Sequence, residues 1–354
     1  MNISLQKLPL DINVKTSDIY ENLNKASRAL GELKGESKTI PNEEILINTL
    51  ALQEAKDSSA IENIITTQDD LYRADADDSF NNLAAKEVKN YANALKKGFK
   101  LVKKHHLLTN NYILEIQKII EPIKQGFRRI PGTVLQNSAG ETIYKPPQDA
   151  NEIVALMSNL ENYINEDSLH DIDPLIKMAI IHYQFESIHP FYDGNGRTGR
   201  IINILYLLQK KLLDIPVLYL SKYIIENKTD YYQLLQGVRT ENDWESWIIW
   251  MLNGIAETSQ HTVIIISEIK RLMMDYKHRI RNQYKFYSQD LINNLFKHPY
   301  TKIEFVEHEL RVSRKTASGY LNQLSEDGFV KKMKIKNSNY YVNLPLFTLF
   351  AGEE

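Results

Sequence analysis

The sequence contains no cysteine, so it has neither a disulfide nor a thiolate ligand for a metal. It also lacks an excess of charge of one sign, since 43 Lys and Arg residues stand against 45 Asp and Glu residues. A balanced charge excludes a global electrostatic attraction to nucleic acid or membranes. No apolar run approaches the roughly 18 residues that a membrane span needs. The N-terminal stretch MNISLQKLPLDINVKTSD has no apolar core of the signal-peptide type. We therefore expect a cytoplasmic protein without a membrane segment.

Glycine is sparse, at 14 of 354 residues, yet three glycines fall within residues 189–200, HPFYDGNGRTGR. The segments on either side, 174–188 and 201–213, have the apolar pattern of helices. A polar and flexible segment inside the most apolar region of a chain indicates a functional site rather than an ordinary turn.

This segment carries the parts of an anion-binding site. Gly194, Asn195 and Gly196 can present consecutive backbone N–H groups, because glycine tolerates positive φ. A helix that begins directly after them adds unpaired N–H groups and the positive end of its dipole. Arg197 and Arg200 lie three residues apart on one face of that helix, where each can bind phosphate oxygens through two N–H groups. The pattern predicts a cradle for a chain of phosphates.

Two further side chains of the segment add chemistry to the cradle. Asp193 is a hard oxygen ligand beside the predicted anion site, which suits Mg²⁺ bound to phosphates. His189 closes the preceding helix and can act as a general base near neutral pH. The segment holds no nucleophile, so the substrate has to supply one. Alone, such a histidine is usually a cap and a Gly-Asn-Gly run is usually a turn, but together these groups indicate a site.

The segment resembles the motif of the Fic family, HPFx(D/E)GN(G/K)RxxR, and matches it at every constrained position. Residues 130–148 alternate as a β-hairpin does, and they are similar to the flap of that family. The resemblance implies a mainly α fold, in which a helical Fic core carries a short β-hairpin flap. It also implies a protein adenylyltransferase, which transfers AMP from ATP to a Tyr, Thr or Ser hydroxyl of a target protein and releases pyrophosphate.

The resemblance also implies a role for each motif residue. His189 would deprotonate the target hydroxyl, and Asp193 would hold Mg²⁺ against the phosphates. Phe191 has no polar role and is expected to anchor the loop in the core. Glycine at position 196, where a variant of the family has lysine, favours AMP transfer over phosphorylation. The nucleotide-binding residues would be Gly194, Asn195, Gly196, Arg197 and Arg200, with Asn195 on the α-phosphate and Arg200 on the γ-phosphate.

Residues 58–64, SSAIENI, resemble the inhibitory motif (S/T)xxxE(G/N) of the same family. Ser58, Glu62 and Asn63 occupy its constrained positions. The resemblance implies that Glu62 pairs with Arg200 and leaves the γ-phosphate without its partner. Two alternatives stay open: a solvated helix face with no regulatory role, and a catalytic Glu62 that removes AMP from the target.

From about residue 285 the chain changes character. Residues 302–310 and 313–328 predict two helices joined by a tight turn, and residues 329–344 predict two strands around an Asn-Ser-Asn turn. That order is typical of a winged helix-turn-helix domain. Its basic residues leave both DNA binding and protein docking open; they are Arg311, Arg314, Lys315, Lys331, Lys332, Lys334 and Lys336.

The sequence therefore predicts three parts. Residues 1–104 form an N-terminal helical region with the inhibitory helix, although residues 1–40 are polar and are expected to pack loosely. Residues 105–283 form the Fic catalytic core and its flanking helices, and residues 284–354 form the winged-helix domain. The expected partners are a hydroxyl-bearing protein of unknown identity and, through the last part, DNA. A homodimer stays open.

Overall fold

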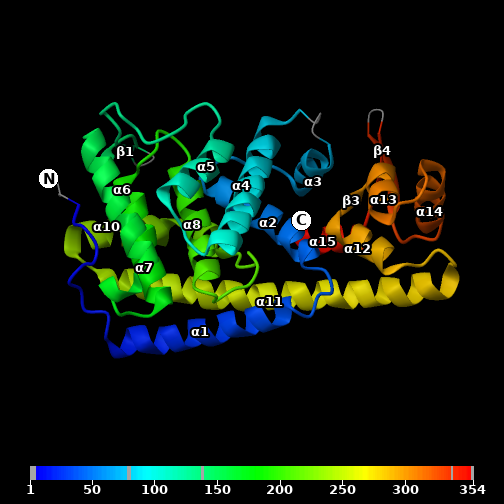
Figure 1. Cartoon of the computed structure of the whole chain (residues 1–354), viewed down its shortest axis with the longest axis horizontal. Coiled ribbons are helices and arrows are strands. Elements are labelled where there is room, and N and C mark those ends of the chain that lie inside the picture. Colours follow the sequence, from blue (N-terminus) through cyan, green and yellow to red (C-terminus); the bar gives the residue numbers. More distant parts are fainter. Residues whose placement is uncertain (1–4, 78–80, 137–138, 336–337, 352–354) are drawn as a thin grey trace.

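The computed structural model describes residues 5–77, 81–136, 139–335 and 338–351, and helices dominate it (Figure 1). The helices are α1 (Ser17–Ser37), α2 (Glu43–Ile61), α3 (Gln68–Ala76), α4 (Leu83–His105), α5 (Asn110–Ile120), α6 (Ala150–Asn165), α7 (Pro174–Ile188), α8 (Asn195–Gln209), α9 (Leu220–Glu226), α10 (Lys228–Glu241), α11 (Trp244–Gln283), α12 (Gln289–Lys297), α13 (Ile303–Leu310), α14 (Arg314–Glu326) and α15 (Leu344–Ala351), with a 3₁₀ turn at Asp167–Leu169. The strands are β1 (Leu135–Gln136), β2 (Thr142–Tyr144), β3 (Tyr300–Thr301), β4 (Lys331–Ile335) and β5 (Ser338–Val342). The predicted mainly α fold is confirmed.

Polar side chains cap the N-termini of several helices. Asn42 accepts a hydrogen bond from the Glu44 N–H (3.0 Å), and Thr109 accepts one from the Tyr112 N–H (3.4 Å). Such caps satisfy N–H groups that have no partner inside the helix. The helix predicted over residues 174–188 is present as α7, and the helix predicted after the polar segment is present as α8, whereas α3, α12 and α15 were not predicted.

Helices α7 and α8 form the centre of the larger part of the molecule. Every residue of α7 from Leu175 to Ile188 is buried, because α6, α8 and α11 pack around it. Helix α8 also contacts α2, α4 and α5. The loop between α7 and α8 is therefore held at both ends by the most rigid elements of the fold, which suits a site that requires fixed geometry.

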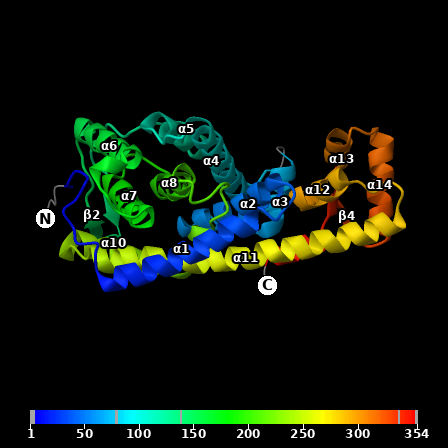
Figure 2. The ribbon, with the colours of Figure 1, turned by 60° about the horizontal axis from the view of Figure 1, so that its bottom comes forward.

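The expectation that residues 1–40 pack loosely is wrong for residues 17–37. Helix α1 lies along the 40-residue helix α11, which runs beneath both parts of the molecule (Figures 1 and 2). Ile19, Ala26, Leu30 and Leu33 are buried on that side of α1. Their spacing is that of an amphipathic helix, and it is the signal in the sequence that would have shown the packing.

The C-terminal part contains the predicted helices and strands in the predicted order. Helices α13 and α14 precede the antiparallel pair β4–β5, and β5 also pairs with β3. Lys336 and Asn337, at the expected strand end and turn, lie outside the described residues. The winged-helix assignment and the three domain boundaries stay predictions, and α11 continues without a break from the larger part into this one (Figure 2).

In the described part of the chain, no helix combines the length and apolar character that crossing a membrane demands.

Candidate active site

The polar segment adopts a sharp turn that delivers the chain into α8. Gly194 is the N-cap of this helix and has a left-handed φ of 78°, which glycine adopts readily. The Asn195 side chain accepts from the Phe191 N–H (2.8 Å) and donates to the Phe191 carbonyl (2.9 Å), so it closes the loop from within. The first N–H groups of α8 have no partner inside the helix, and the turn holds them at one place. The turn thus brings the residues of the predicted anion site together, while phosphate binding there, including a contact of the Asn195 side chain, stays a prediction.

Arg200 is buried beneath this turn and is paired with the predicted inhibitory residues. Its Nε donates to Ser58 Oγ (2.7 Å), and its Nη2 donates to the Ser58 carbonyl (2.8 Å) and to Glu62 Oε1 (2.9 Å). Burial alone would lower the pKa of Arg200, but Glu62 and other anionic neighbours raise it above its usual value. The predicted pairing of Glu62 with Arg200 is present.

Glu62 is the residue directly after α2, and it lies over the first turn of α8. A Cβ atom built on Gly196 would lie 2.2 Å from Glu62 Oε1, which leaves no room for any larger residue while Glu62 stays in place. Asn63 follows with a left-handed φ of 62°, a conformation that glycine and asparagine adopt most easily. The three residues of the inhibitory motif therefore supply a hydrogen-bond acceptor, a carboxylate and a turn.

Arg197, one turn earlier than Arg200, is also buried against a carboxylate. Its Nη2 lies 2.5 Å from Glu121 Oε1, at the end of α5. Glu87 and Asp193 lie further from the same guanidinium, at 3.6 and 3.7 Å. Sequence reasoning missed Glu121, which carries no motif of its own.

His189 ends α7 in a left-handed conformation (φ 49°, ψ 58°). Burial lowers the pKa of its imidazole to about 4, and the positive charge of Arg128 acts in the same direction. The imidazole is therefore neutral at pH 7, the form in which it can accept a proton. Phe191, two residues later, is fully buried and stacks on Phe127 with ring centroids 5.5 Å apart, so the predicted anchor is confirmed.

Asp193 is partly exposed at the edge of the turn. Its Oδ1 accepts from the Gly194 N–H (2.8 Å), and its Oδ2 lies 3.4 Å from Lys124 Nζ. Among the described residues, no group of three or more His, Asp or Glu side chains is arranged to hold a metal. One carboxylate beside an anion site fits Mg²⁺, which commonly binds through one or two carboxylates together with substrate phosphates.

Two buried glutamates that the sequence did not single out surround Arg200. Burial raises the pKa of Glu54 to about 7, although hydrogen bonds from Ser221 act against the rise. Burial likewise raises the pKa of Glu186 to about 7, and the charge of Arg200 opposes that shift. Glu54 precedes Ser58 and Glu62 by four and eight residues, so helical spacing was a signal that could have found it.

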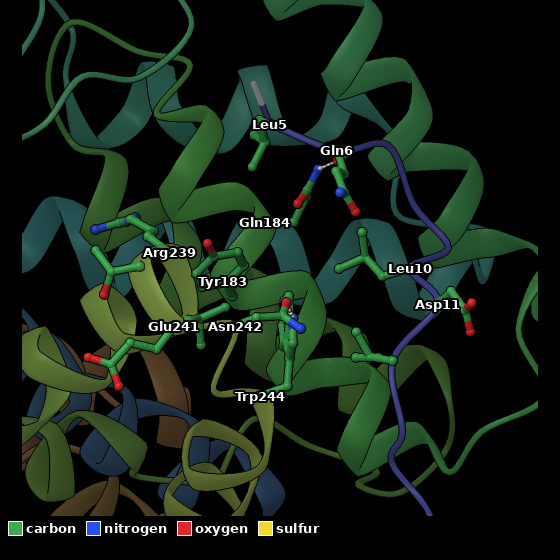
Figure 3. A pocket seen from close by; sticks show the side chains of 13 residues that line it. Leu5, Gln6, Leu10, Asp11, Tyr183, Gln184, Arg239, Glu241, Asn242 and Trp244 are labelled. Carbon is green, nitrogen blue, oxygen red and sulfur yellow. Dashed lines mark hydrogen bonds between the residues drawn. The ribbon is translucent and has the colours of Figure 1, made fainter. Parts of the chain in front are cut away.

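A separate cavity of about 520 Å³ lies where the N-terminal segment, residues 5–12, crosses α7 and the start of α11 (Figure 3). Tyr183, Arg239 and Trp244 are among its lining residues, and Gln184 donates to the Gln6 carbonyl across it (2.8 Å). None of the predicted site residues lines this cavity. The anion site at α8 is thus distinct from it.

The fold and site together define a mainly helical protein with a glycine-containing turn at the head of a central, buried helix. Three family models match the chain. Residues 20–100 match the Fic/DOC family N-terminal model, residues 107–207 match the Fic/DOC family model, and residues 272–346 match the C-terminal domain of SoFic-like protein adenylyltransferases. The first two span more than half of the chain, and the protein belongs to the Fic/DOC family.

Curated relatives share the central region. The chain is similar to the protein adenylyltransferase Fic of Culex quinquefasciatus (30% identity over 168 residues, 46% of this chain and 30% of the relative). It is also similar to the protein adenylyltransferase fic-1 of Caenorhabditis briggsae (27% identity over 139 residues, 38% of this chain and 25% of the relative). The chain thus spans less than a third of the length of these relatives in the match. A crystal structure of a Fic family protein from Desulfovibrio desulfuricans G20 has the same fold (TM-score 0.59, 20% identity, 94% of this chain and 97% of the other).

Proposed function

We propose that this protein is a self-inhibited protein adenylyltransferase, which transfers AMP from ATP to a hydroxyl side chain of a target protein. The observation that carries the proposal is the contact of Glu62 and Ser58 with Arg200 at the head of α8. A buried arginine at a helix N-terminus is suited to a phosphate, and here a carboxylate occupies it. The names of the curated relatives, protein adenylyltransferases, support the same activity.

The reaction follows from the groups around the turn. The N–H groups of α8 and the guanidinium of Arg197 bind the phosphates of ATP, and Arg200 binds the γ-phosphate once Glu62 has moved. The neutral imidazole of His189 accepts the proton of the target hydroxyl. The hydroxyl oxygen forms a bond to the α-phosphorus, the bond from the α-phosphorus to the bridging oxygen breaks, and pyrophosphate leaves. Catalysis is then mainly positioning and charge neutralisation.

Asp193 is the residue that would hold Mg²⁺ beside the nucleotide, because its carboxylate is partly exposed and adjoins the anion site. The ion would neutralise phosphate charge. The flap, β1 and β2, would orient the target by strand pairing, since Thr142 and Ile143 are exposed on it. Backbone pairing would place the hydroxyl while demanding little of the target sequence.

The experiment that tests the proposal is incubation with α-labelled ATP, Mg²⁺ and cell lysate. Glu62→Gly should raise AMP transfer, including self-modification, by at least about tenfold, because a misplaced α-phosphorus costs more rate than affinity. His189→Ala in that background should abolish the labelling. Glu241→Gly, at the end of α10, is a matched control that should change neither. Label transfer in Glu62→Gly no faster than in wild type would refute the inhibitory assignment.

A second activity, removal of AMP from a modified target, is favoured by the position of Glu62. Its side chain is about one-third exposed (36%) next to the head of α8, where a carboxylate can activate water. A target modified in advance separates the two directions. If Glu62→Gly loses the release of AMP and gains no transfer, removal is the activity.

DNA binding by the C-terminal part has weaker support than the enzyme. Arg314 lies 3.5 Å from Glu304 and 3.8 Å from Glu307, so acidic neighbours offset its charge. Lys332 donates to Asn322 (2.8 Å). If the part binds DNA, replacing Arg314 and Lys315 with alanine should weaken binding across sequences and flatten its salt dependence. Wild-type protein without affinity for DNA at low salt would leave protein docking.

A further inference from the structure

Arg128 lies between α5 and the flap, and its side chain is almost completely buried (1% exposed). Every hydrogen bond that its guanidinium makes with the described residues goes to a backbone carbonyl oxygen. Nε donates to the carbonyl of His189 (2.8 Å), and Nη2 donates to the carbonyls of Ile188 (3.3 Å) and Pro147. Charged side chains are rarely buried this deeply unless they are paired. A buried charge of this kind, with no role in the reaction described above, calls for a function.

The three carbonyls belong to two segments that have to act together. Ile188 and His189 end α7, where the carbonyl groups lack partners inside the helix. Pro147 ends the returning arm of the flap, and Arg128 itself begins the outgoing arm. The Arg128 N–H also donates to the Pro190 carbonyl (2.8 Å). One residue therefore joins both arms of the flap to the backbone of the catalytic histidine.

Neighbouring contacts restrain the same two segments. The Tyr192 hydroxyl accepts from the N–H groups of Arg129 (2.8 Å) and Ile130 (3.0 Å). The Tyr144 hydroxyl, on β2, donates to the Ser187 carbonyl (2.9 Å). The exposed flap is thus fixed to the histidine loop through its two ends rather than through packing of its own.

We propose that Arg128 is a positioning residue, which holds the flap in register with His189 so that a hydroxyl presented on the flap meets the base. This inference rests on the proposed AMP transfer. A register error of about 1 Å between the base and the hydroxyl is enough to lower the rate about a hundredfold. Arginine is suited to the task because its planar guanidinium directs several N–H groups at once, which a lysine ammonium does not reproduce.

Arg128 also affects the charge of the base. The charged groups that act on His189 are Arg128 and Arg239, which lower its pKa together with burial, and Glu62, which raises it. Lysine at position 128 would keep the charge and lose the directed hydrogen bonds. Methionine would keep much of the volume and lose both, so the pKa of His189 would rise.

The test compares Arg128→Lys and Arg128→Met in the Glu62→Gly background, with ATP affinity and thermal stability measured alongside. Arg128→Lys should lower kcat for target modification at least about tenfold, leave the Kd of ATP within about twofold, and keep the acid limb of the pH profile in place. Arg128→Met should shift that limb to higher pH. Tyr192→Phe, which removes an acceptor at an exposed ring, should lower kcat by a smaller factor without affecting folding.

A second readout does not depend on activity. Hydrogen exchange in Arg128→Lys should speed up along residues 127–136 and stay unchanged in α8. If the Glu62→Gly parent transfers no AMP, the proposed function fails, while faster flap exchange still supports the restraint by Arg128. Parent-like kcat and exchange in Arg128→Lys would overturn the inference. Equal losses in ATP affinity, stability and kcat would also overturn it, because they would mark Arg128 as a general structural residue.

Discussion

Arg197 and Arg200 stand one turn apart at the head of α8, are equally buried, and each contacts a carboxylate. The origin of those carboxylates differs. Glu121 ends α5, a helix of the same family model as α8, and its sequence distance from Arg197 is 76 residues. Glu62 follows α2, in the N-terminal model, and lies 138 residues from Arg200. The nearest carboxylate of Arg197 thus comes from the catalytic unit, and that of Arg200 comes from outside it.

The partners of Arg200 also form a more complete set. Ser58 supplies two acceptors and Glu62 a third, whereas Arg197 has its one short contact with Glu121 and two longer ones. An external segment that satisfies a buried charge so well can replace a phosphate. The difference suggests that only the Arg200 contact works as a switch, and the predictions below test it.

The largest effect should come from Arg200 itself. Arg200→Ala should lower AMP transfer at least about a hundredfold, because it removes the charged group proposed to bind the γ-phosphate. Glu62→Gly should not restore the activity, because removing Glu62 cannot help when the arginine that it blocked is missing. Initial rates with α-labelled ATP provide the measurement, and Arg271→Ala on the exposed side of α11 is the control. Rescue by Glu62→Gly would show that Arg200 serves only to bind the inhibitory residues.

The next effect concerns pH. The two arginines contact carboxylates, whereas burial and the charges of Arg128 and Arg239 lower the pKa of the His189 imidazole. A histidine with the ordinary pKa of about 6.5 would be about one-tenth neutral at pH 5.5, whereas one with a pKa of about 4 would be almost fully neutral. Protonation removes the base as pH falls through its pKa, so transfer by Glu62→Gly should stay within about twofold between pH 7.5 and 5.5. A tenfold fall at pH 5.5, with unchanged circular dichroism, would contradict the buried, neutral base.

Glu121 should give a smaller and different effect. Glu121→Gln leaves Arg197 without its nearest anion while Glu87 and Asp193 stay close, so the free protein should lose about 1–3 kcal/mol of stability. The phosphates no longer compete with a carboxylate, and ATP affinity should rise about two- to tenfold. Thermal unfolding with and without ATP measures both quantities, and Glu115→Gln, on the exposed side of α5, is the matched control. If Glu121→Gln instead speeds transfer as much as Glu62→Gly, the distinction between the two arginines is lost.

The sequence predicts the site better than it predicts the site's surroundings. The base, the turn and the two arginines lie in twelve contiguous residues, so their chemistry is visible without a fold. The pairing of Glu62 with Arg200 was predictable only through resemblance to a family. Arg128 and Glu121 were not, because their partners are backbone carbonyls and a distant arginine that only the fold brings near. Helix α1 was not predicted for a different reason. Its apolar residues have helical spacing, but the many polar residues between them made residues 1–40 look loosely packed.

The C-terminal part contacts the two helices that precede and follow Glu62 in the chain. Lys297 of α12 lies 2.6 Å from Glu44 of α2, and the Tyr300 ring stacks on Tyr72 of α3 (5.8 Å). The Tyr72 hydroxyl in turn accepts from Gln53 of α2 (3.3 Å). Helices α2 and α3 flank Glu62 in the chain, so a change in these contacts could shift the turn that carries Glu62.

The smallest effect should therefore come from loosening that contact. Lys297→Glu combined with Tyr300→Phe reverses one charge and removes the hydrogen bond from Tyr300 to Asp69, while the apolar packing stays. Surface ion pairs and single hydrogen bonds contribute about 1 kcal/mol or less each, so transfer should rise only about two- to fivefold. The rise should vanish in the Glu62→Gly background, because there no carboxylate occupies Arg200. Lys285→Glu, outside the contact, is the charge-matched control. An equal rise with and without Glu62 would mean that the C-terminal part acts on the catalytic core directly, and the external origin of the Arg200 contact would then have no regulatory meaning.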